Sequence, residues 1–360
     1  MTQQTFAITG REPRVVLEQL AGNLTVQPWD RQEISVETDG PIAVLQQEND
    51  TVILRDCKTD LLLRVSAIQR IVFPIVTTIE AKGVSRNVMI DGAGDVLLRD
   101  IGGNVSLRDI YGDVALENVS EVAELTSIDG NLRATAMPRL SAQKGVGGNA
   151  WLADIARIEI DAVGGNLSLA KTSVATIGMV GGNLDADAIE ATLRCNAVGG
   201  NSSITNCASA EITLSKVGGN LQIDGAKSVQ SSLVGGNLRV GAAFPPESSS
   251  RFYVGGNARV FLPESANLSI HGLVGGSASG DSATFTHGGG FVNVSYGEGA
   301  ATLSIHVGGN LKVFGGGIPR NNGGGIPWSE FGREMGRVGR QFGREFAAAF
   351  HQGYEPGKYD

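Results

Sequence analysis

The sequence has few charged and few aromatic residues. Of its 360 residues, 18% are charged and 6% are aromatic, and the formal net charge is -8. Proteins that bind nucleic acid usually carry a basic patch or stripe, so this acidic balance argues against nucleic acid as a partner. Low charge combined with glycine at 51 positions favours a turn-rich architecture over an ordinary α/β enzyme.

Cysteine and long apolar runs are also scarce. Cys57, Cys195 and Cys207 are odd in number, widely separated and outside any metal-binding spacing, so we interpret them as reduced thiols. No stretch approaches the roughly 18 uninterrupted apolar residues that a membrane-spanning helix requires. The opening residues, MTQQTFAITGREPRVV, lack the pattern of a secretory signal. We therefore expect a cytoplasmic protein.

One four-residue phrase, Val-Gly-Gly-Asn, dominates the middle of the chain. Its asparagine recurs at intervals of 17 to 20 residues between positions 149 and 257, and the phrase returns at position 310. Such a short period indicates stacked supersecondary units. Related phrases upstream, GDVLLRD, GNVSLRD and GDVALEN, follow at nine-residue intervals, so one unit contains two similar halves. The asparagines of the phrase are Asn149, Asn166, Asn183, Asn201, Asn220, Asn237, Asn257 and Asn310.

The residues after each asparagine alternate between aliphatic and variable positions. Leu167 and Leu169 flank a serine, and the same spacing recurs in the other units. This alternation predicts a strand with one buried face. Units of 17 to 20 residues are too short for helical hairpins. The sequence therefore predicts an all-β fold, a single β-solenoid of about 17–20 residues per coil, followed by a C-terminal amphipathic α-helix.

We interpret the glycines and asparagine of the phrase as a structural corner of each coil. Two successive glycines allow backbone angles, including φ > 0, that other residues resist. Asparagine tolerates such corners and can bond its side-chain amide to the same group in the next coil. Calcium-binding nonapeptides need aspartate where asparagine or serine stands here, and no phosphate-binding loop is present. We therefore expect no cofactor-binding and no metal-ligating residues.

The variable position two residues after the asparagine is mixed in charge and size, which is typical of a solvated face. Acidic residues such as Asp185 and Asp187 are scattered, so we expect no catalytic residues and no enzyme. Arg239, Arg259 and Lys312 are neighbours in this series, but we interpret them as plain surface. The series contains Ser106, Arg133, Trp151, Ser168, Asp185, Ser203, Gln222, Arg239, Arg259 and Lys312.

Three histidines follow similar phrases near the end of the repeats. His271 and His306 end NLSIH and TLSIH, and His287 lies between them in TFTHGGG. If all three aligned on consecutive coils, neighbours about 4.8 Å apart could share a metal ion. The alignment of His287 is slipped by about one residue, so the sequence favours surface histidines without a metal.

The residues from about 5 to 315 resemble the "putative adhesin" family, a bacterial β-strand-repeat domain of unknown function. The segments that carry the likeness are GNLTVQPWDRQEISVET, RIVFPIVTTIEAKGVSRNVMIDGAGDVLLRDIGGNVSL and the coils marked by Gly-Asn or Gly-Asp. This resemblance implies a β-solenoid and supplies no catalytic residues. It also implies a surface protein, which the missing signal contradicts. A more distant similarity, in period and compartment alone, is to bactofilins, cytoplasmic solenoids that polymerise end to end.

The tail contains the pattern of an amphipathic helix. Its apolar residues are spaced by three or four positions, and a glycine stripe and an arginine stripe run beside and opposite them. Interior glycines cost about 1 kcal/mol each, so this helix needs a partner. The apolar stripe is Trp328, Phe331, Met335, Val338, Phe342, Phe346 and Phe350. The glycine stripe is Gly332, Gly336, Gly339 and Gly343, and the arginine stripe is Arg333, Arg337, Arg340 and Arg344.

These patterns divide the chain into five parts. Residues 1–86 are irregular N-terminal strands or a cap continuous with the solenoid, 87–314 the regular solenoid, 315–327 a glycine-rich linker, 328–352 the helix, and 353–360 a tail. We expect a non-enzymatic scaffold whose helix mediates homo-oligomerisation or docks a protein partner. The alternative is a peripheral membrane-binding module that uses the same helix. A polysaccharide-active β-helix enzyme is a third hypothesis.

Overall fold

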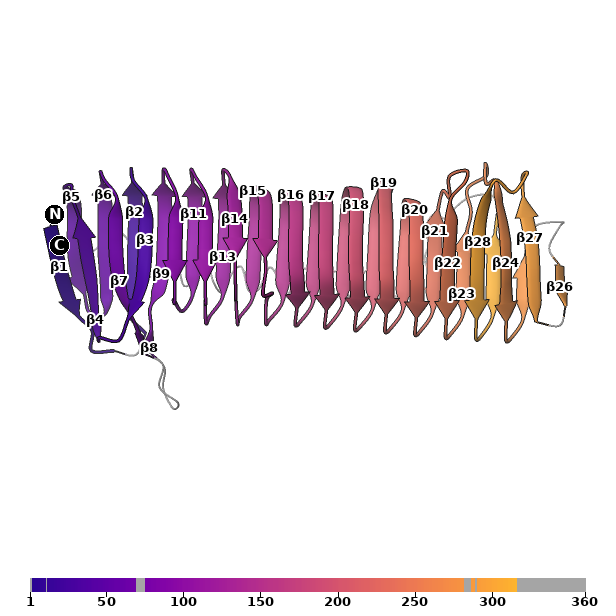
Figure 1. The fold of residues 1–360 in the computed structure, drawn as a ribbon, viewed down its shortest axis with the longest axis horizontal. Helices are drawn as coiled ribbons and strands as arrows, with labels where there is room; N and C mark the ends of the chain where they lie inside the picture. The colour runs from indigo at the N-terminus through magenta and orange to yellow at the C-terminus, as the bar shows by residue number, and fades with distance from the viewer. Residues whose placement is uncertain (1, 11, 69–74, 282–285, 289, 316–360) are drawn as a thin grey trace, which may run out of the picture. The chain divides into compact units, whose positions relative to one another are not determined.

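The computed structural model describes residues 2–10, 12–68, 75–281, 286–288 and 290–315. Regular elements in this part of the chain are all β-strands, and no helix occurs in it. Contacts join Met1–Ile318 into one compact unit. Figure 1 shows its strands side by side in a long stack, as in a β-solenoid-like fold. The predicted helix over 328–352, most of the predicted linker and the tail lie outside the described residues.

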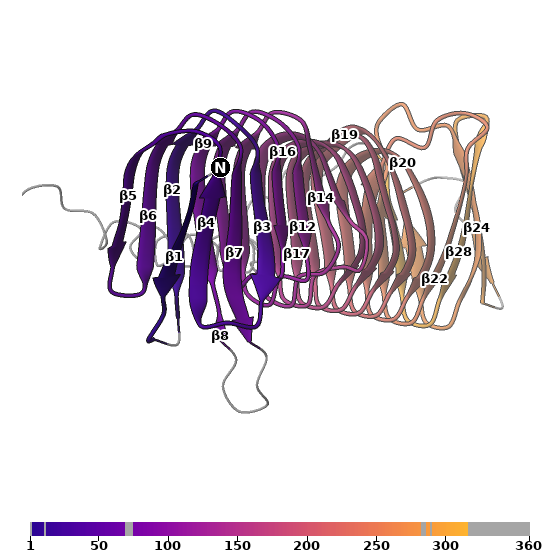
Figure 2. The same cartoon turned by 60° about the vertical axis from the view of Figure 1, so that its left-hand side comes forward.

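Strand pairing builds two columns, which we call face A and face B. The central strands bend and contribute their first half to face A and their second half to face B. These strands are β15 (Leu132–Ala142), β16 (Ala150–Val163), β17 (Leu167–Val180), β18 (Leu184–Val198), β19 (Ser202–Val217) and β20 (Leu221–Val234). Figure 2 shows the coils stacked behind one another, with the N-terminal strands forward.

Shorter strands continue each face toward the ends of the stack. On the N-terminal side, face A consists, in spatial order, of β5 (Ile42–Glu48), β6 (Thr51–Cys57), β2 (Arg14–Leu20), β9 (Thr78–Val84), β11 (Val96–Ile101) and β13 (Val114–Val119). Face B consists there of β1 (Thr2–Ala7), β4 (Glu33–Thr38), β7 (Leu61–Ile68), β3 (Leu24–Trp29), β10 (Val88–Asp91), β12 (Val105–Arg108) and β14 (Val122–Leu125). On the C-terminal side, face A continues with β21 (Leu238–Ala242), β23 (Ala258–Phe261), β29 (Leu311–Phe314) and β25 (Ala278–Gly280). Face B continues there with β22 (Ser249–Val254), β28 (Ala301–Val307), β24 (Leu268–Val274), β27 (Phe291–Tyr296) and β26 (Thr286–Gly288). A short strand, β8 (Ile75–Val76), pairs with β7 alone.

The core lies between the two faces and follows the alternation in the sequence. In β17, Leu167, Leu169 and Ile177 point inward and are at most 1% exposed. Burial of such a side chain stabilises the fold by roughly 1.5–3 kcal/mol, and every coil repeats it. The nine-residue half-repeats correspond to the two faces, because β11 lies on face A and β12 on face B.

Spatial order departs from chain order at both ends of the stack. At the N-terminal end, the coil of β2 and β3 lies between the coil of β6 and β7 and the coil of β9 and β10. At the C-terminal end, the coil of β28 and β29 lies between β22 and β23 on one side and β24 and β25 on the other. Antiparallel strands occur where the chain turns back, for example in the β5–β6, β1–β4 and β24–β27 pairs.

Candidate functional site

The corner asparagines form one continuous hydrogen-bonded ladder along the stack. In each step, Oδ1 of one asparagine accepts a bond from the backbone N–H of the next asparagine at 2.8–2.9 Å and from its side-chain Nδ2 at 3.0–3.3 Å. Asp95 and Asp113 start the ladder, and Ser277 ends it. In spatial order its amide members are Asn131, Asn149, Asn166, Asn183, Asn201, Asn220, Asn237, Asn257 and Asn310.

The glycines of the phrase are needed for close stacking, and the expectation that they supply φ > 0 was wrong. None of them has a positive φ in the described residues. A Cβ atom on Gly199 would lie 2.2 Å from the carbonyl oxygen of Gly181, and one on Gly200 would lie 2.4 Å from Oδ1 of Asn183. Consecutive corners therefore stack backbone on backbone, with no room for a side chain between them.

Positive φ angles instead occur at a second turn, which sequence reasoning missed. This turn lies five residues after the ladder asparagine or aspartate, where the chain passes from face A to face B. Ala188 has φ 55° and Lys171 has φ 51°, although neither residue type favours the left-handed region. A signal existed in the sequence, because most residues at this turn are aspartate, asparagine or glycine, the types that tolerate the left-handed region. Its residues are Asp100, Asn118, Ala136, Asp154, Lys171, Ala188, Asn206 and Gly225.

The outward series on face A runs in direct register from Arg133 to Lys312. Ser106 does not belong to it, because the nine-residue half-repeat places Ser106 on face B, opposite Met89 and Glu124. Asp185 lies between Ser168 and Ser203 in this series, and burial, with a smaller contribution from Asp187, raises its pKa. These two carboxylates are the acidic residues named from the sequence, and no third acidic side chain is opposite them in the neighbouring strands.

The three basic residues of the series lie on consecutive strands. Arg239 pairs with Arg259, and Arg259 pairs with Lys312. The Arg239 guanidinium contacts Asp224 at 3.1 Å and lies 4.4 Å from the centre of the Phe261 ring. Phe261 stacks on Phe314 with ring centres 4.9 Å apart. This basic and aromatic patch belongs to the last coils of face A.

The remaining titratable candidates are dispersed. His271 pairs with Ser304 and His306 with Leu273, so the two histidines lie in different columns. The backbone of His287 pairs with Val292. All three cysteines are buried, and burial raises the pKa of the Cys57 and Cys195 thiols to about 11. Within the described ranges, no group of three or more histidine, cysteine or acidic side chains is arranged to hold a metal ion.

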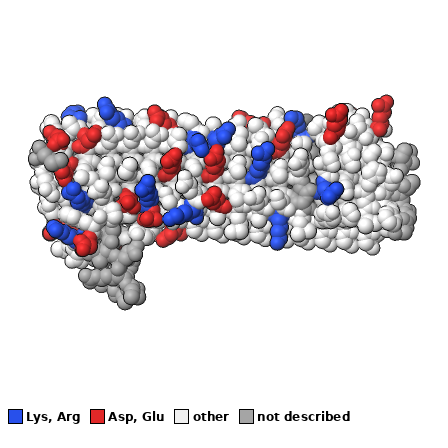
Figure 3. Space-filling model, in the orientation of Figure 1, with Lys and Arg blue, Asp and Glu red and all other residues white. Residues whose placement is uncertain are grey.

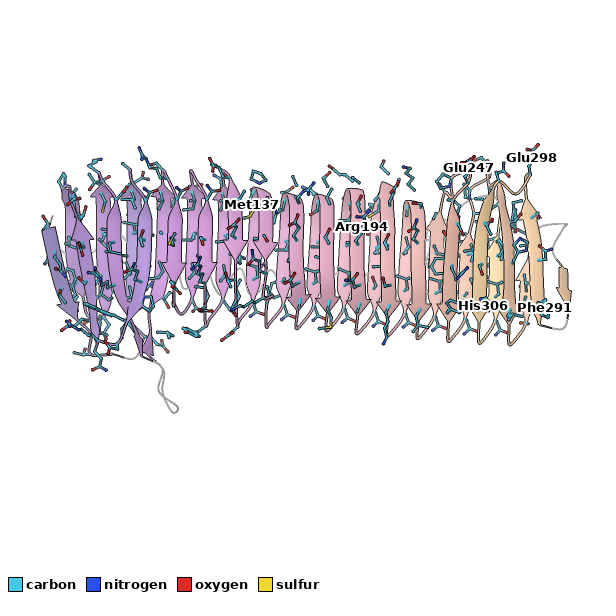
Figure 4. The ribbon with its side chains drawn as sticks, viewed as in Figure 1. Met137, Arg194, Glu247, Phe291, Glu298 and His306 are labelled. Carbon is cyan, nitrogen blue, oxygen red and sulfur yellow. The ribbon has the colours of Figure 1, made fainter. Side chains whose placement is uncertain are left out.

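A row of outward apolar side chains on face B was also missed by sequence reasoning. The repeat marks four of its members, because Leu233, Tyr253, Leu273 and His306 each directly precede the valine of a Val-Gly-Gly phrase, although the spatial order of their strands differs from chain order. We call this row the C-terminal stripe, and it consists of Leu233, Tyr253, His306, Leu273 and Phe291. Figure 4 shows His306 and Phe291 along the lower edge of the stack at its C-terminal end.

The chain leaves the described solenoid at a defined point. The Asp281 carboxylate accepts hydrogen bonds from the backbone N–H of Gly315 at 2.7 and 2.8 Å and from the Tyr296 hydroxyl at 3.0 Å. Burial and this carboxylate raise the pKa of Tyr296, so the phenol keeps its donor proton. The predicted interaction residues Trp328 to Phe350, with their glycine and arginine stripes, follow this point and lie outside the described residues.

Comparisons with known proteins give little. No family model matches the chain, and no curated protein matches it. In the described part of the chain, no helix has the length and apolar character to cross a membrane. One similar solved structure, from Clostridium sporogenes, is described as a "putative cell adhesion protein". It is 9% identical, the similarity covers 87% of this chain and 99% of that chain, and the TM-score is 0.15.

Proposed function

We propose that this protein is a non-enzymatic scaffold that self-assembles or docks a protein partner through residues 328–352. The single observation that carries the proposal is the attachment of Gly315 by Asp281 near the C-terminal end of a continuously bonded stack. A ladder of side-chain amides and a core repeated in each coil support a stiff body. Such a body holds the start of the tail at a fixed position, from which residues 328–352 reach a partner.

The amphipathic pattern of residues 328–352 supports a protein partner over a lipid surface. Its four arginines are offset by Glu330, Glu334 and Glu345, which leaves about one net positive charge. Electrostatic attraction to anionic lipid is worth about 1 kcal/mol per basic residue, so one net charge gives little affinity. The glycine stripe beside the aromatic stripe allows another backbone to approach closely.

Solution mass is the measurement that tests this proposal. We expect the full chain to be larger than a monomer, and the chain lacking residues 316–360 to have a lower mass. The variant Phe342→Ser with Phe346→Ser should lose the association, whereas Arg340→Ser with Arg344→Ser should keep it. Equal masses for the full and shortened chains would contradict the proposal.

Vesicle sedimentation distinguishes the membrane alternative. Vesicles rich in anionic lipid should not pellet the full chain more than the shortened chain. Pelleting that requires residues 316–360 and is reduced by the arginine substitutions would favour the lipid surface instead.

A further inference from the structure

The C-terminal stripe is a continuous apolar row on consecutive strands. Leu233 pairs with Tyr253, Tyr253 with His306, His306 with Leu273, and Leu273 with Phe291. The exposed fractions are 48% for Leu233, 43% for Tyr253, 41% for Leu273 and 66% for Phe291. Single exposed apolar residues are ordinary on protein surfaces, but a row of this length marks an interaction site.

The surface around the stripe is shallow, and the charged residues Lys216 and Arg251 lie beside it. Corner residues Gly255, Gly275 and Gly308 border it and leave a shallow depression of about 480 Å³, which these corners line together with all stripe residues except Phe291. The Tyr253 and His306 rings stack with centres 5.0 Å apart, and Nδ1 of His306 is shielded from water. Figure 3 shows that charged residues gather over the N-terminal part of this face and become sparse toward its C-terminal end.

The residue that precedes the stripe in the same column is Lys216, which pairs with Leu233. From Lys216 to Phe291 the column therefore reads Lys, Leu, Tyr, His, Leu, Phe. Two copies of this column that run in opposite directions therefore place compatible side chains opposite each other. When two such columns face each other in opposite directions, leucine meets leucine, tyrosine meets histidine, and lysine meets phenylalanine.

We infer that the C-terminal stripe binds the same stripe of a second copy of this chain, with the two solenoids antiparallel. A two-fold axis parallel to the strands produces this contact, which is the self-complementary kind found in symmetric dimers. Leu233 packs on Leu273 of the second copy, and the Tyr253 ring packs on His306 of the second copy. The Lys216 ammonium lies over the Phe291 ring of the second copy, where cation–π attraction favours it.

The neighbouring outward positions fit the same arrangement. Arg251 and Ser304 are paired on adjacent strands beside Tyr253 and His306. In the antiparallel dimer, Arg251 faces Ser304 of the second copy, so these two positions bring no like charges together. The four most exposed stripe side chains present roughly 400 Å² per copy, if a large apolar side chain has about 200 Å². The total of roughly 800 Å² is below the 1,200 Å² of standard interfaces, so the dimer is weak and depends on concentration.

This contact goes beyond the proposed function and does not depend on residues 328–352. The test uses the full chain and measures its dimer dissociation constant by sedimentation velocity over a range of concentrations. Leu273→Thr with Phe291→Thr should raise that constant about a hundredfold, because each large apolar anchor that is lost costs about one tenfold step. Met179→Thr is the matched control, because Met179 is 53% exposed in the same column, opposite Ala162 and Ala197. An unchanged constant in the double variant, or an equal rise in the control, would overturn the inference.

Cysteine cross-linking tests the register of the two copies. The native cysteines are buried, so introduced cysteines report alone. A mixture of Leu233→Cys chains and Leu273→Cys chains should form covalent dimers on mild oxidation, whereas either variant alone should not. Covalent dimers from one variant alone would overturn the antiparallel arrangement. If the tail has no role in assembly, deletion of residues 316–360 leaves the mass unchanged, and that result is separate from the stripe experiments.

Discussion

Each ladder asparagine binds the next coil through one atom, its side-chain oxygen Oδ1. Its Oδ1 accepts two hydrogen bonds, and its own Nδ2 donates to the coil before it. The sequence predicted this role because the asparagines recur with the coil. It did not predict why glycine precedes them. Glycine is needed there because the backbones of consecutive coils are in close contact. The conformational preferences of a single residue give no information about such a contact.

Glycine substitutions in the corner and in the second turn distinguish two reasons for glycine, the lack of space for a Cβ atom and the need for a positive φ. Gly199→Ala should destabilise the fold by about 3 kcal/mol or more, because the new methyl group would overlap the Gly181 carbonyl. Gly225→Ala meets no atom within 4 Å, and its φ of 77° alone should cost about 1–2 kcal/mol. Urea unfolding of both variants checks the difference, and a larger loss for Gly225→Ala would contradict this explanation.

Asn183→Ala should lower the unfolding free energy by about 1–3 kcal/mol, because it leaves the part-buried backbone N–H of Asn201 without its acceptor. Asn183→Asp keeps the acceptor oxygen for Asn201 but sets a carboxylate oxygen against Oδ1 of Asn166 in place of the donor, so it should cost less than Asn183→Ala only if the acceptor is the more important part. Thermal unfolding at neutral pH compares the two. Equal losses would mean that the acceptor atom is not the important part of the ladder.

The stability of the fold should depend on pH through Asp185. Its pKa in the folded state is raised above the ordinary 3.8 by burial and by Asp187, so the protonated acid is the form that the fold accommodates. Its favourable contribution is present below the unfolded pKa and is lost as the pH rises through the folded pKa. Asp185→Asn should therefore stabilise the protein at pH 7 and make no difference below pH 3.8. Denaturant midpoints at both pH values measure this, and a loss of stability at pH 7 would contradict it.

Strands of this protein were predictable from alternation, and the turns between their halves were not. Leu167 and Leu169 alternate with outward residues as a strand requires, and the 17-residue spacing defines the coil. The second turn uses aspartate, asparagine or glycine in most coils, but Ala136, Lys171 and Ala188 adopt the same left-handed angle although their residue types do not favour it. The neighbouring coils hold this angle in place, so its cause lies outside the local sequence.

Relief of that turn should stabilise the bent strand β18. Ala188→Gly removes a Cβ atom from a residue with φ 55° and should raise the unfolding free energy by up to about 1 kcal/mol. Ala153→Gly, at an ordinary strand position of β16, is the matched control and should lower it by about 0.5–1 kcal/mol. Differential scanning calorimetry measures both, and destabilisation by Ala188→Gly would show that the left-handed turn carries no strain.

The sequence predicted one stack of coils, but it did not predict that the spatial order of the coils departs from chain order at both ends of the stack. Asn257 accepts a hydrogen bond from Asn310, 53 residues later in the sequence. The strands that lie between these two residues in the sequence stack beyond the coil of β28 and β29, on its far side from β22 and β23. A weak signal existed in the sequence, since VGGS at Ser277 replaces asparagine where the ladder ends. The row Arg239, Arg259 and Lys312 followed from the repeat alone. The place of Phe291 beside Leu273 depends on the antiparallel pairing of β24 with β27, which no repeat spacing indicates.

Hydrogen exchange should reflect spatial order and not chain order. Amides of β28 are paired on both sides, with β22 and β24, and should exchange more slowly than amides of β26, which pairs with β27 alone. Mass spectrometry of peptides from these strands measures the rates. Faster exchange in β28 than in β26 would contradict the described topology.

The position of the coil formed by β28 and β29 also decides how the protein responds to mechanical force. The chain that follows Gly315 is attached to a coil held by neighbours on both sides, and not to the outermost rung. A pull on the tail cannot peel away one exposed edge bond by bond. It has to rupture two ladders together, so we expect Gly315 to withstand a larger pull than a residue of the outermost rung would.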